Sequence, residues 1–324
     1  YECGLGIPAE PLFRSSYERL RVKWKLRKLY INRLREYVCQ VQPYLISCVR
    51  LFLLGPVLKV RGEIPLIVES HSSCRSYQYE VDGMFKRLRE VYYVHQVRKA
   101  QMVVALTEGD ATDWRRYNKH VIVIPNFVHL NETGNYSDCL SKSAIFVGRF
   151  SKQKDIGMLL KIWSVVHQKY PEWKLHIYGG YGDQYKQLMT IVPHVVSDNI
   201  FVHDSTPNIF DEYLKNSMLL LTSLYEPFGL VIPEAMSCGL PVVAFDCPYG
   251  PASIISDGVD GFLVKNRDVS SYCNAVFNLI SNDSIRQEVG KAGVISSQRY
   301  KISNIMPLWK SLFESCVNMN NKVE

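Results

Sequence analysis

The chain has 324 residues, of which 47% are hydrophobic and 21% are charged, and its formal net charge at pH 7 is +7. This composition is typical of a globular protein with room for two domains, and it excludes a disordered or fibrous chain. The sequence has no apolar run of about 18 residues, and its nine cysteines are scattered without a Cys-x-x-Cys pair, which argues against a transmembrane span, a disulfide framework and a zinc site.

The first predicted element is an amphipathic helix with a strongly basic face. Nine Lys or Arg residues and a single acid, Glu18, lie between Arg14 and Arg35. Apolar residues recur in this region at helical spacing, at Tyr17, Leu20, Trp24, Ile31, Leu34 and Val38. Such helices bind anionic membrane surfaces, but a helix packed on its own domain with solvated basic side chains fits the pattern equally well. A nucleic-acid role is not indicated, because no recognition module accompanies the charge.

Strands alternating with helices follow, and this order argues for a parallel sheet covered by helices. Apolar runs predict strands at residues 45–47, 65–69, 102–106 and 121–124, and a long helix through residues 85–92. His71 follows the second of these strands, at the edge where open parallel sheets bind ligands. A histidine there is either a functional group or an ordinary satisfied polar residue. Asn126, after the last strand, either reaches the same edge or forms a turn.

A polar stretch at residues 131–143 is typical of a linker, so we expect an N-terminal domain at residues 1–138 and a second domain at residues 139–300. The second domain repeats the alternation, with strands predicted near residues 144–148, 174–178, 200–202, 218–221 and 242–245, and helices near 270–280 and 285–297. A last amphipathic helix, within residues 301–324, carries Ile305, Leu308, Trp309, Leu312, Phe313 and Cys316.

A basic turn follows the first strand of the second domain. Arg149 comes directly after the strand, Lys154 lies five residues later, and a helical pattern begins after Asp155. A strand, a basic turn and a helix N-terminus form an anion site, because arginine offers phosphate a planar fork and lysine a point charge. A basic residue near a loop is more often only solvated. Function is indicated here because Arg149 and Lys154 lie between a strand and the helix that follows it.

The most informative segment is residues 225–241, YEPFGLVIPEAMSCGLP. Glu226 lies in the loop after a buried strand, where open α/β sheets hold ligands. Glu234 lies in the first turn of a helix that begins near Pro233. The alternatives are a solvated loop acid at Glu226 and a surface acid at Glu234 that complements the helix dipole.

These two constellations resemble the retaining family-four glycosyltransferases of the GT-B fold, in which two Rossmann-like domains with parallel sheets face each other across a cleft. The resemblance is strongest from residue 144 to 264 and extends more weakly from 67 to 313. It implies that Glu226 and Phe228 contact the donor sugar and that Glu234 binds the nucleotide ribose. It also implies that His71 touches the donor sugar and contributes to catalysis.

The same resemblance assigns the donor phosphates to Arg149 and Lys154, together with the backbone around Gly229 and Leu230. It further implies that the last helix packs back on the first domain, where Trp309 would make contact. No Asp-x-Asp motif occurs. We therefore expect fixed cations in place of a metal ion, and no cofactor.

The resemblance implies a retaining hexosyltransferase that moves a hexose from a nucleoside diphosphate sugar to a glycan or lipid-linked glycan acceptor in polysaccharide biosynthesis. The alternatives are a non-catalytic sugar-nucleotide-binding subunit or decayed homologue, and another GT-B enzyme such as an inverting transferase, an epimerase or a phosphorylase. The start at Tyr1 has no signal-peptide pattern, so we expect a cytoplasmic location, with peripheral contact to the inner face of the membrane. A complete GT-B protein begins with a strand and a glycine-rich loop, and the sequence shows neither at its start. We therefore expect a first domain truncated at its N-terminus.

Overall fold

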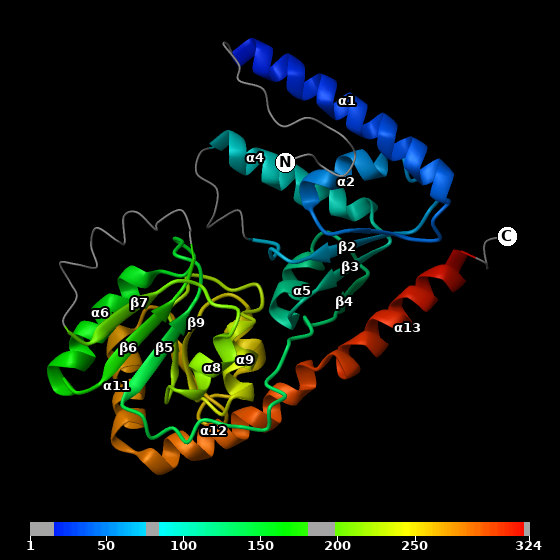
Figure 1. Cartoon of the computed structure of the whole chain (residues 1–324). Coiled ribbons are helices and arrows are strands. Elements are labelled where there is room, and N and C mark those ends of the chain that lie inside the picture. Colours follow the sequence, from blue (N-terminus) through cyan, green and yellow to red (C-terminus); the bar gives the residue numbers. More distant parts are fainter. Residues whose placement is uncertain (1–15, 76–83, 181–197, 321–324) are drawn as a thin grey trace.

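The computed structural model describes residues 16–75, 84–180 and 198–320, which form two α/β domains (Figure 1). Each domain is built on one parallel sheet, with four strands in the N-terminal domain and six in the C-terminal domain. Helices lie against both sheets. The expected pair of parallel-sheet domains is confirmed. The truncation of the first domain stays a prediction, because residues 1–15 lie outside the described residues.

The N-terminal sheet has the strand order β1-β2-β3-β4, with all neighbouring pairs parallel. Its strands are β1 (Ile46–Cys48), β2 (Leu66–Ser70), β3 (Met102–Ala105) and β4 (Val121–Val123). Its helices are α1 (Ser16–Val41), α2 (Leu51–Leu58), α4 (Met84–Gln96), the short 3₁₀ helix η1 (Val97–Lys99) and α5 (Glu108–Trp114). Parallel strands need long crossovers, and the helices between these strands supply them. The predicted strands are confirmed within a residue or two at each end.

Helix α1 packs on its domain over only part of its length. Leu34 packs against the core and Val38 is 9% exposed, whereas Trp24 is 66% exposed. In Figure 1 the N-terminal half of α1 extends away from the sheet. The C-terminal half of the helix thus packs on its own domain, whereas contact of the basic segment with a membrane surface stays a prediction. Residues 14 and 15 and the side chains of residues 16–20 lie outside the described residues.

The C-terminal sheet has the strand order β10-β9-β8-β5-β6-β7, again with every pair parallel. Its strands are β5 (Ser143–Val147), β6 (Lys174–Tyr178), β7 (Ile200–His203), β8 (Leu219–Leu221), β9 (Val242–Asp246) and β10 (Phe262–Lys265). Its helices are α6 (Ile156–Lys169), α8 (Ile209–Leu214), α9 (Val231–Ser237), α10 (Gly250–Ile254), α11 (Val269–Ser281), α12 (Asp283–Ser297) and η2 (Gln298–Tyr300). Apolar clusters cover both faces of this sheet. The sequence analysis missed β10, a short strand at the sheet edge.

The last helix, α13 (Ile302–Asn320), leaves the C-terminal domain and packs on the N-terminal sheet (Figure 1). Ile305, Leu312 and Cys316 are at most 3% exposed and cluster with residues of β2 and β3 and with Ile124. Trp309 packs against the same cluster. The predicted return of this helix to the first domain is confirmed, whereas the domain limits at residues 138 and 300 stay predictions.

Candidate active site

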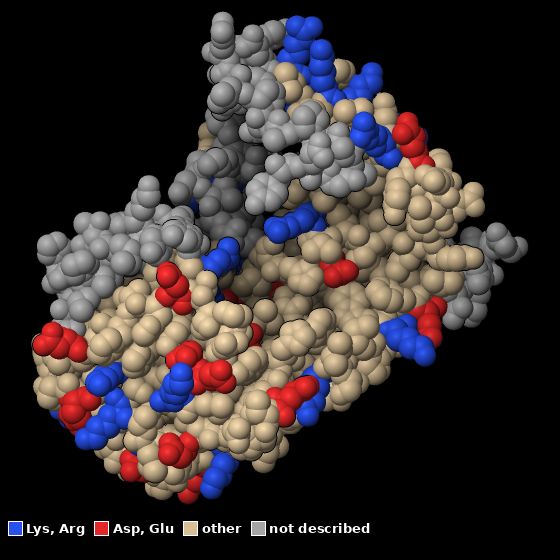
Figure 2. Space-filling model, viewed as in Figure 1, with Lys and Arg blue, Asp and Glu red and all other residues tan. Residues whose placement is uncertain are grey.

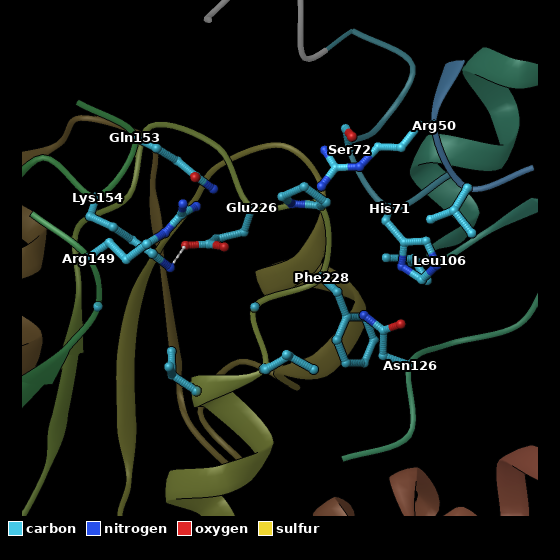
Figure 3. Close-up of a pocket in the computed structure, with 16 residues that line it drawn as sticks. Arg50, His71, Ser72, Leu106, Asn126, Arg149, Gln153, Lys154, Glu226 and Phe228 are labelled. Carbon is cyan, nitrogen blue, oxygen red and sulfur yellow. Dashed lines mark hydrogen bonds and ion pairs between the residues drawn. The ribbon is translucent and has the colours of Figure 1, made fainter. Parts of the chain in front are cut away.

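A cleft of about 800 Å³ opens between the two domains, at the carboxyl ends of strands from both sheets. Figure 2 shows it as a hollow with Lys or Arg side chains at its mouth. The C-terminal domain lines it with Gly148, Arg149, Gln153, Lys154 and residues 226–231, and the N-terminal domain lines it with Val49, Arg50, His71, Ser72, Leu106 and Asn126 (Figure 3). Ligand pockets usually measure about 300–1,000 Å³, so the cleft has room for a sugar nucleotide.

Lys154 and Glu226 form a buried ion pair on the C-terminal wall of this cleft (Figure 3). Lys154 Nζ lies 2.5 Å from Glu226 Oε1, and the two side chains are 12% and 5% exposed. Ser223 Oγ donates to the same oxygen at 2.6 Å. Among the described residues, no side chain bonds to Glu226 Oε2. The carboxylate is therefore fixed by one oxygen and can accept a ligand hydroxyl with the other.

The basic turn that carries Lys154 is anchored in the C-terminal domain. Thr222 Oγ1 lies 3.2 Å from the carbonyl oxygens of both Lys154 and Asp155. Asp155 caps α6 by accepting from Met158 N at 3.2 Å, and Arg267 NH1 donates to its other oxygen at 2.8 Å. These bonds hold the turn at a fixed place beside the loop of Glu226.

Arg149 lies on the same wall as Lys154 (Figure 3). Within the described part of the chain, its guanidinium has neither a carboxylate partner nor a hydrogen-bond acceptor. The pairing of Glu226 with Lys154 leaves the charge of Arg149 uncompensated. The Arg149 guanidinium on this wall is therefore available to an anionic ligand, next to the ion pair of Lys154 and Glu226.

The loop from Glu226 to α9 is shaped by close packing. Gly229 has φ +92°, a region that favours glycine. Phe228 is 3% exposed, and its ring packs edge-on against Tyr300 with centroids 5.2 Å apart. A Cβ on Gly250 would lie 1.8 Å from the carbonyl oxygen of Phe228, so only glycine fits there. Phe228, Gly229 and Leu230 all line the cleft, and their contact with a donor sugar or its phosphates stays a prediction.

Glu234 lies one helical turn after Leu230, and its backbone N–H donates to the carbonyl oxygen of Leu230 at 3.2 Å. It is not among the described residues that line the cleft. Tyr213 donates its hydroxyl to Glu234 Oε2 at 3.2 Å, and burial raises the pKa of Glu234 above its ordinary value. Its assignment to the nucleotide ribose stays a prediction.

His71 lies on the N-terminal wall, across the cleft from Glu226 (Figure 3). Its Nε2 is 3.1 Å from Glu69 Oε2, and its side chain is 40% exposed. Ser47 donates to the other oxygen of Glu69, and the bond from His71 lowers the pKa of Glu69. The sequence analysis missed Glu69 as the partner of His71. The alternation of a strand, which places residues two apart on one face, was the available signal.

Arg50 is a second residue of this wall that the sequence analysis missed. It directly precedes α2, two residues after β1 ends, and lines the cleft beside Ser72 (Figure 3). The described residues offer its side chain no ion-pair partner. The reasoning that selected His71 would also have found Arg50, because both follow strands at the carboxyl edge of the sheet.

No group of three or more His, Cys, Asp or Glu side chains that could hold a metal ion occurs in the part of the chain that the structure describes. The chemistry that the cleft itself supplies is cationic and hydrogen-bonding. Independence from metal ions and cofactors stays a prediction.

Both halves of the chain match known protein families. Residues 140–294 match the family model described as glycosyl transferases group 1, and residues 4–132 match the one described as glycosyltransferase family 4. The two matches divide the chain near the junction of the two domains.

Similar proteins carry related descriptions. A poly(ribitol-phosphate) alpha-N-acetylglucosaminyltransferase of Staphylococcus aureus is 29% identical over 73% of this chain and 48% of its own length. The amylovoran biosynthesis glycosyltransferase AmsD of Erwinia amylovora is 28% identical over 82% of this chain and 74% of its own. The chain thus spans about half the length of the first of these relatives.

A solved structure, Anabaena Alr3699/HepE in complex with UDP and glucose, superposes with a TM-score of 0.74. The match covers 93% of this chain and 83% of that protein at 20% sequence identity. At this identity the likeness shows the fold alone, and that fold agrees with the two family matches.

Proposed function

Because the chain belongs to the GT-B glycosyltransferases, with a family-four N-terminal part and a group 1 C-terminal part, we propose that it is a retaining hexosyltransferase of polysaccharide biosynthesis. The observation that carries this proposal is the convergence of Arg149, Lys154 and Glu226 on one wall of a cleft, opposite His71. Cations beside a carboxylate suit a ligand that is anionic at one end and rich in hydroxyl groups at the other.

The donor would be a nucleoside diphosphate hexose. Arg149 and Lys154 would bind its diphosphate, with the main chain at Gly229 and Leu230, and Glu226 Oε2 would accept a hydroxyl of the sugar. The Anabaena structure holds UDP and glucose, so UDP-hexoses are the first donors to test. Glu234 would bind the ribose after a change of its bond to Tyr213.

In the proposed reaction an acceptor hydroxyl attacks the anomeric carbon from the face that the diphosphate leaves. The bond from the anomeric carbon to the diphosphate oxygen breaks, a bond to the acceptor oxygen forms, and the acceptor proton passes to a donor phosphate oxygen. The protein contributes by positioning the reactants and by stabilising the negative charge of the leaving diphosphate. Fixed cations stabilise this charge strongly in a site from which water is partly excluded. His71 would contact the sugar from the N-terminal wall, and no metal ion or cofactor would be needed.

The acceptor would enter along the N-terminal wall. Arg50, Ser72 and Asn126 line that side of the cleft. The Staphylococcus relative acts on a poly(ribitol-phosphate), as its description states. A cation at Arg50 suits a glycan or lipid-linked glycan that carries phosphate near the hydroxyl that reacts.

The N-terminal half of α1 would contact an anionic membrane surface from the cytoplasmic side. Trp24 is 66% exposed there, with Lys28 Nζ 5.8 Å from its ring centroid. None of the helices in the described residues is long and apolar enough to cross a membrane. We expect Lys25→Glu with Lys28→Glu to abolish sedimentation with phosphatidylserine vesicles at low salt, because basic side chains give the attraction. Binding that persists in this variant, or equal binding to neutral vesicles, would contradict the contact.

The decisive experiment has two stages. A thermal-shift screen of the purified chain with UDP-, GDP- and ADP-hexoses identifies the nucleotide, because a ligand that binds only the folded state raises Tm. The selected donor is then incubated with acceptor glycans, and the anomeric configuration of the product is read by NMR. Retention supports the proposal, and inversion would assign the chain to an inverting transferase.

Matched variants separate an enzyme from a binding subunit. Glu226→Ala should abolish transfer but keep binding of UDP, because UDP lacks the sugar that Glu226 would contact. If the wild-type chain binds the donor but neither transfers the sugar to any acceptor nor hydrolyses the donor, it is a non-catalytic subunit. A product that is an isomer of the donor would indicate an epimerase.

A further inference from the structure

One tyrosine of the C-terminal domain forms a hydrogen bond to the N-terminal domain. Tyr249, between β9 and α10, donates its hydroxyl to Asp113 Oδ2 at 2.8 Å. Asp113 belongs to α5, which Figure 1 shows on the side of the N-terminal domain that faces the other domain. The ring of Tyr249 also lies against Gly109, where a Cβ would be 3.1 Å from ring carbon Cδ1. Tyr249 therefore contacts α5 at two positions one turn apart.

Two arginines bind one oxygen of Asp113 and leave the other oxygen available to Tyr249. Arg75 NH2 lies 2.6 Å from Asp113 Oδ1, and Arg116 NH2 lies 3.6 Å from the same oxygen. The carboxylate is 9% exposed, and its charge is compensated within its own domain, so Oδ2 is left for the phenol. Burial and the bond to Asp113 raise the pKa of Tyr249, so the phenol stays a donor.

The main chain beside Tyr249 is bonded to Glu226. The backbone N–H groups of Tyr249 and Gly250 both donate to the carbonyl oxygen of Glu226 at 2.8 Å. The N–H of Glu226 donates in turn to the carbonyl oxygen of Pro248 at 2.6 Å. The main chain of Glu226 is thus clamped on both sides by residues 248–250, and a path of hydrogen bonds runs from α5 to the residue whose side chain pairs with Lys154.

We propose that Tyr249 is a positioning residue that fixes Glu226 relative to the N-terminal wall of the cleft. The proposal rests on the proposed function, in which Glu226 and His71 contact the donor sugar from opposite domains. Neither Tyr249 nor Asp113 is among the described residues that line the cleft, so Tyr249 acts through Glu226. A displacement of about 1 Å at a reacting centre can lower a rate on the order of 100-fold. The clamp bonds remain after loss of the hydroxyl, so we expect a smaller effect, about tenfold.

The test compares Tyr249→Phe with the wild-type chain. This variant keeps the ring against Gly109 and removes only the hydroxyl. We expect kcat for sugar transfer to fall about tenfold and amide exchange in residues 225–230 to become faster, while the Kd for UDP changes less than about twofold. Thr112→Ala, on α5 beside Asp113, is the matched control and should change none of these quantities, because among the described residues the Thr112 hydroxyl bonds only to Glu108 O of its own helix.

A second variant keeps the proposal falsifiable if the phenol also matters for folding. Asp113→Asn retains an acceptor oxygen for Tyr249, so its kcat should lie between those of wild type and Tyr249→Phe. The double variant should be no slower than Tyr249→Phe, because both changes act on one bond. Unchanged kcat and amide exchange in Tyr249→Phe would overturn the proposal, as would a loss of UDP binding parallel to the loss of kcat. Absence of transfer by the wild-type chain would contradict the proposed function instead, and the amide exchange comparison would still decide the role of Tyr249.

Discussion

Lys154 and Glu226 depend on each other, because both side chains are nearly buried and each is the charge partner of the other. Removing one partner of a buried ion pair leaves the other charge unpaired, and such changes destabilise proteins by about 3–5 kcal/mol. Replacing both partners with uncharged residues avoids that penalty. The pair is therefore a structural element of the folded domain as well as the centre of the candidate site.

Glu226→Gln should lower the free energy of unfolding by about 3 kcal/mol. Lys154→Met should have an effect of the same sign, and the double variant should be more stable than the sum of the two predicts. Urea denaturation of the four proteins completes the double-mutant cycle. Simple additivity would show that the ion pair does not couple the two residues.

Arg149 and Arg50 differ from that pair, because neither has an ion-pair partner in the described residues. Arg149→Ala should raise the Kd for UDP about tenfold, since a hydrogen bond to a charged group contributes about 1.5–3 kcal/mol. Its Tm should stay close to that of the wild-type chain. Isothermal titration and thermal unfolding measure the two quantities.

Arg50→Ala is the control for this prediction on the opposite wall. It should leave the Kd for UDP nearly unchanged and raise the KM for a phosphate-bearing acceptor. Weaker UDP binding in Arg50→Ala, equal to that in Arg149→Ala, would place Arg50 on the donor phosphates instead.

Helix α5 illustrates how a short element can carry a costly buried acid. Thr107 caps the helix by accepting from Asp110 N at 3.2 Å. The carboxylate of Asp110 accepts from Cys74 N at 2.6 Å, Ser70 Oγ at 2.9 Å and Trp114 Nε1 at 3.0 Å. Burial nevertheless raises the pKa of Asp110 from 3.8 to about 6. Between these values the folded chain holds a proton that the unfolded chain has lost.

Stability should therefore fall as the pH rises through that window. A shift of about two pKa units corresponds to about 3 kcal/mol. The Asp110→Asn variant cannot titrate there, so its stability relative to wild type should increase by up to that amount between about pH 4 and pH 6.5. Urea denaturation of both proteins across this range measures the difference. A difference that does not change with pH would mean that Asp110 stays ionised in the folded chain.

At the level of elements, the sequence predicted those features that depend on neighbouring residues, namely the strands and the loops that follow them. The apolar runs marked the strands of both sheets except β10, an edge strand in which only Val264 is buried. The basic turn at Arg149 and Lys154 and the loop at Glu226 were found because each follows a strand whose carboxyl end faces the cleft. The bond from Tyr249 to Asp113 joins residues 136 positions apart, and no periodicity reports such a pairing. Glu234 lay outside the cleft lining because its helix turns it toward Tyr213.

For the whole molecule, α13 joins the two domains by packing on the first sheet. Leu312 is 3% exposed in that contact, whereas Leu308 on the same helix is 43% exposed. Leu312→Ala should lower the free energy of unfolding by about 2–5 kcal/mol, the usual effect of truncating a buried leucine. Leu308→Ala should change it by less than about 1 kcal/mol, as surface substitutions do.

Hydrogen exchange should locate the effect of Leu312→Ala in β2 and β3 of the N-terminal domain, although the substitution lies after the whole C-terminal domain. Equal protection of these strands in the wild-type and variant chains would show that α13 is not needed to hold the first sheet together.

The return of α13 also sets an order of events on the ribosome. The side chains of Ile67, Val104 and Ile124 form one face of the first sheet, and the helix that covers them is translated only after the second domain is complete. A nascent chain therefore exposes this apolar face while roughly 180 further residues are synthesised, which takes on the order of 10–40 seconds at elongation rates of about 5–20 residues per second. During that interval chaperones have an unprotected binding surface, and stalled or prematurely terminated products would retain it.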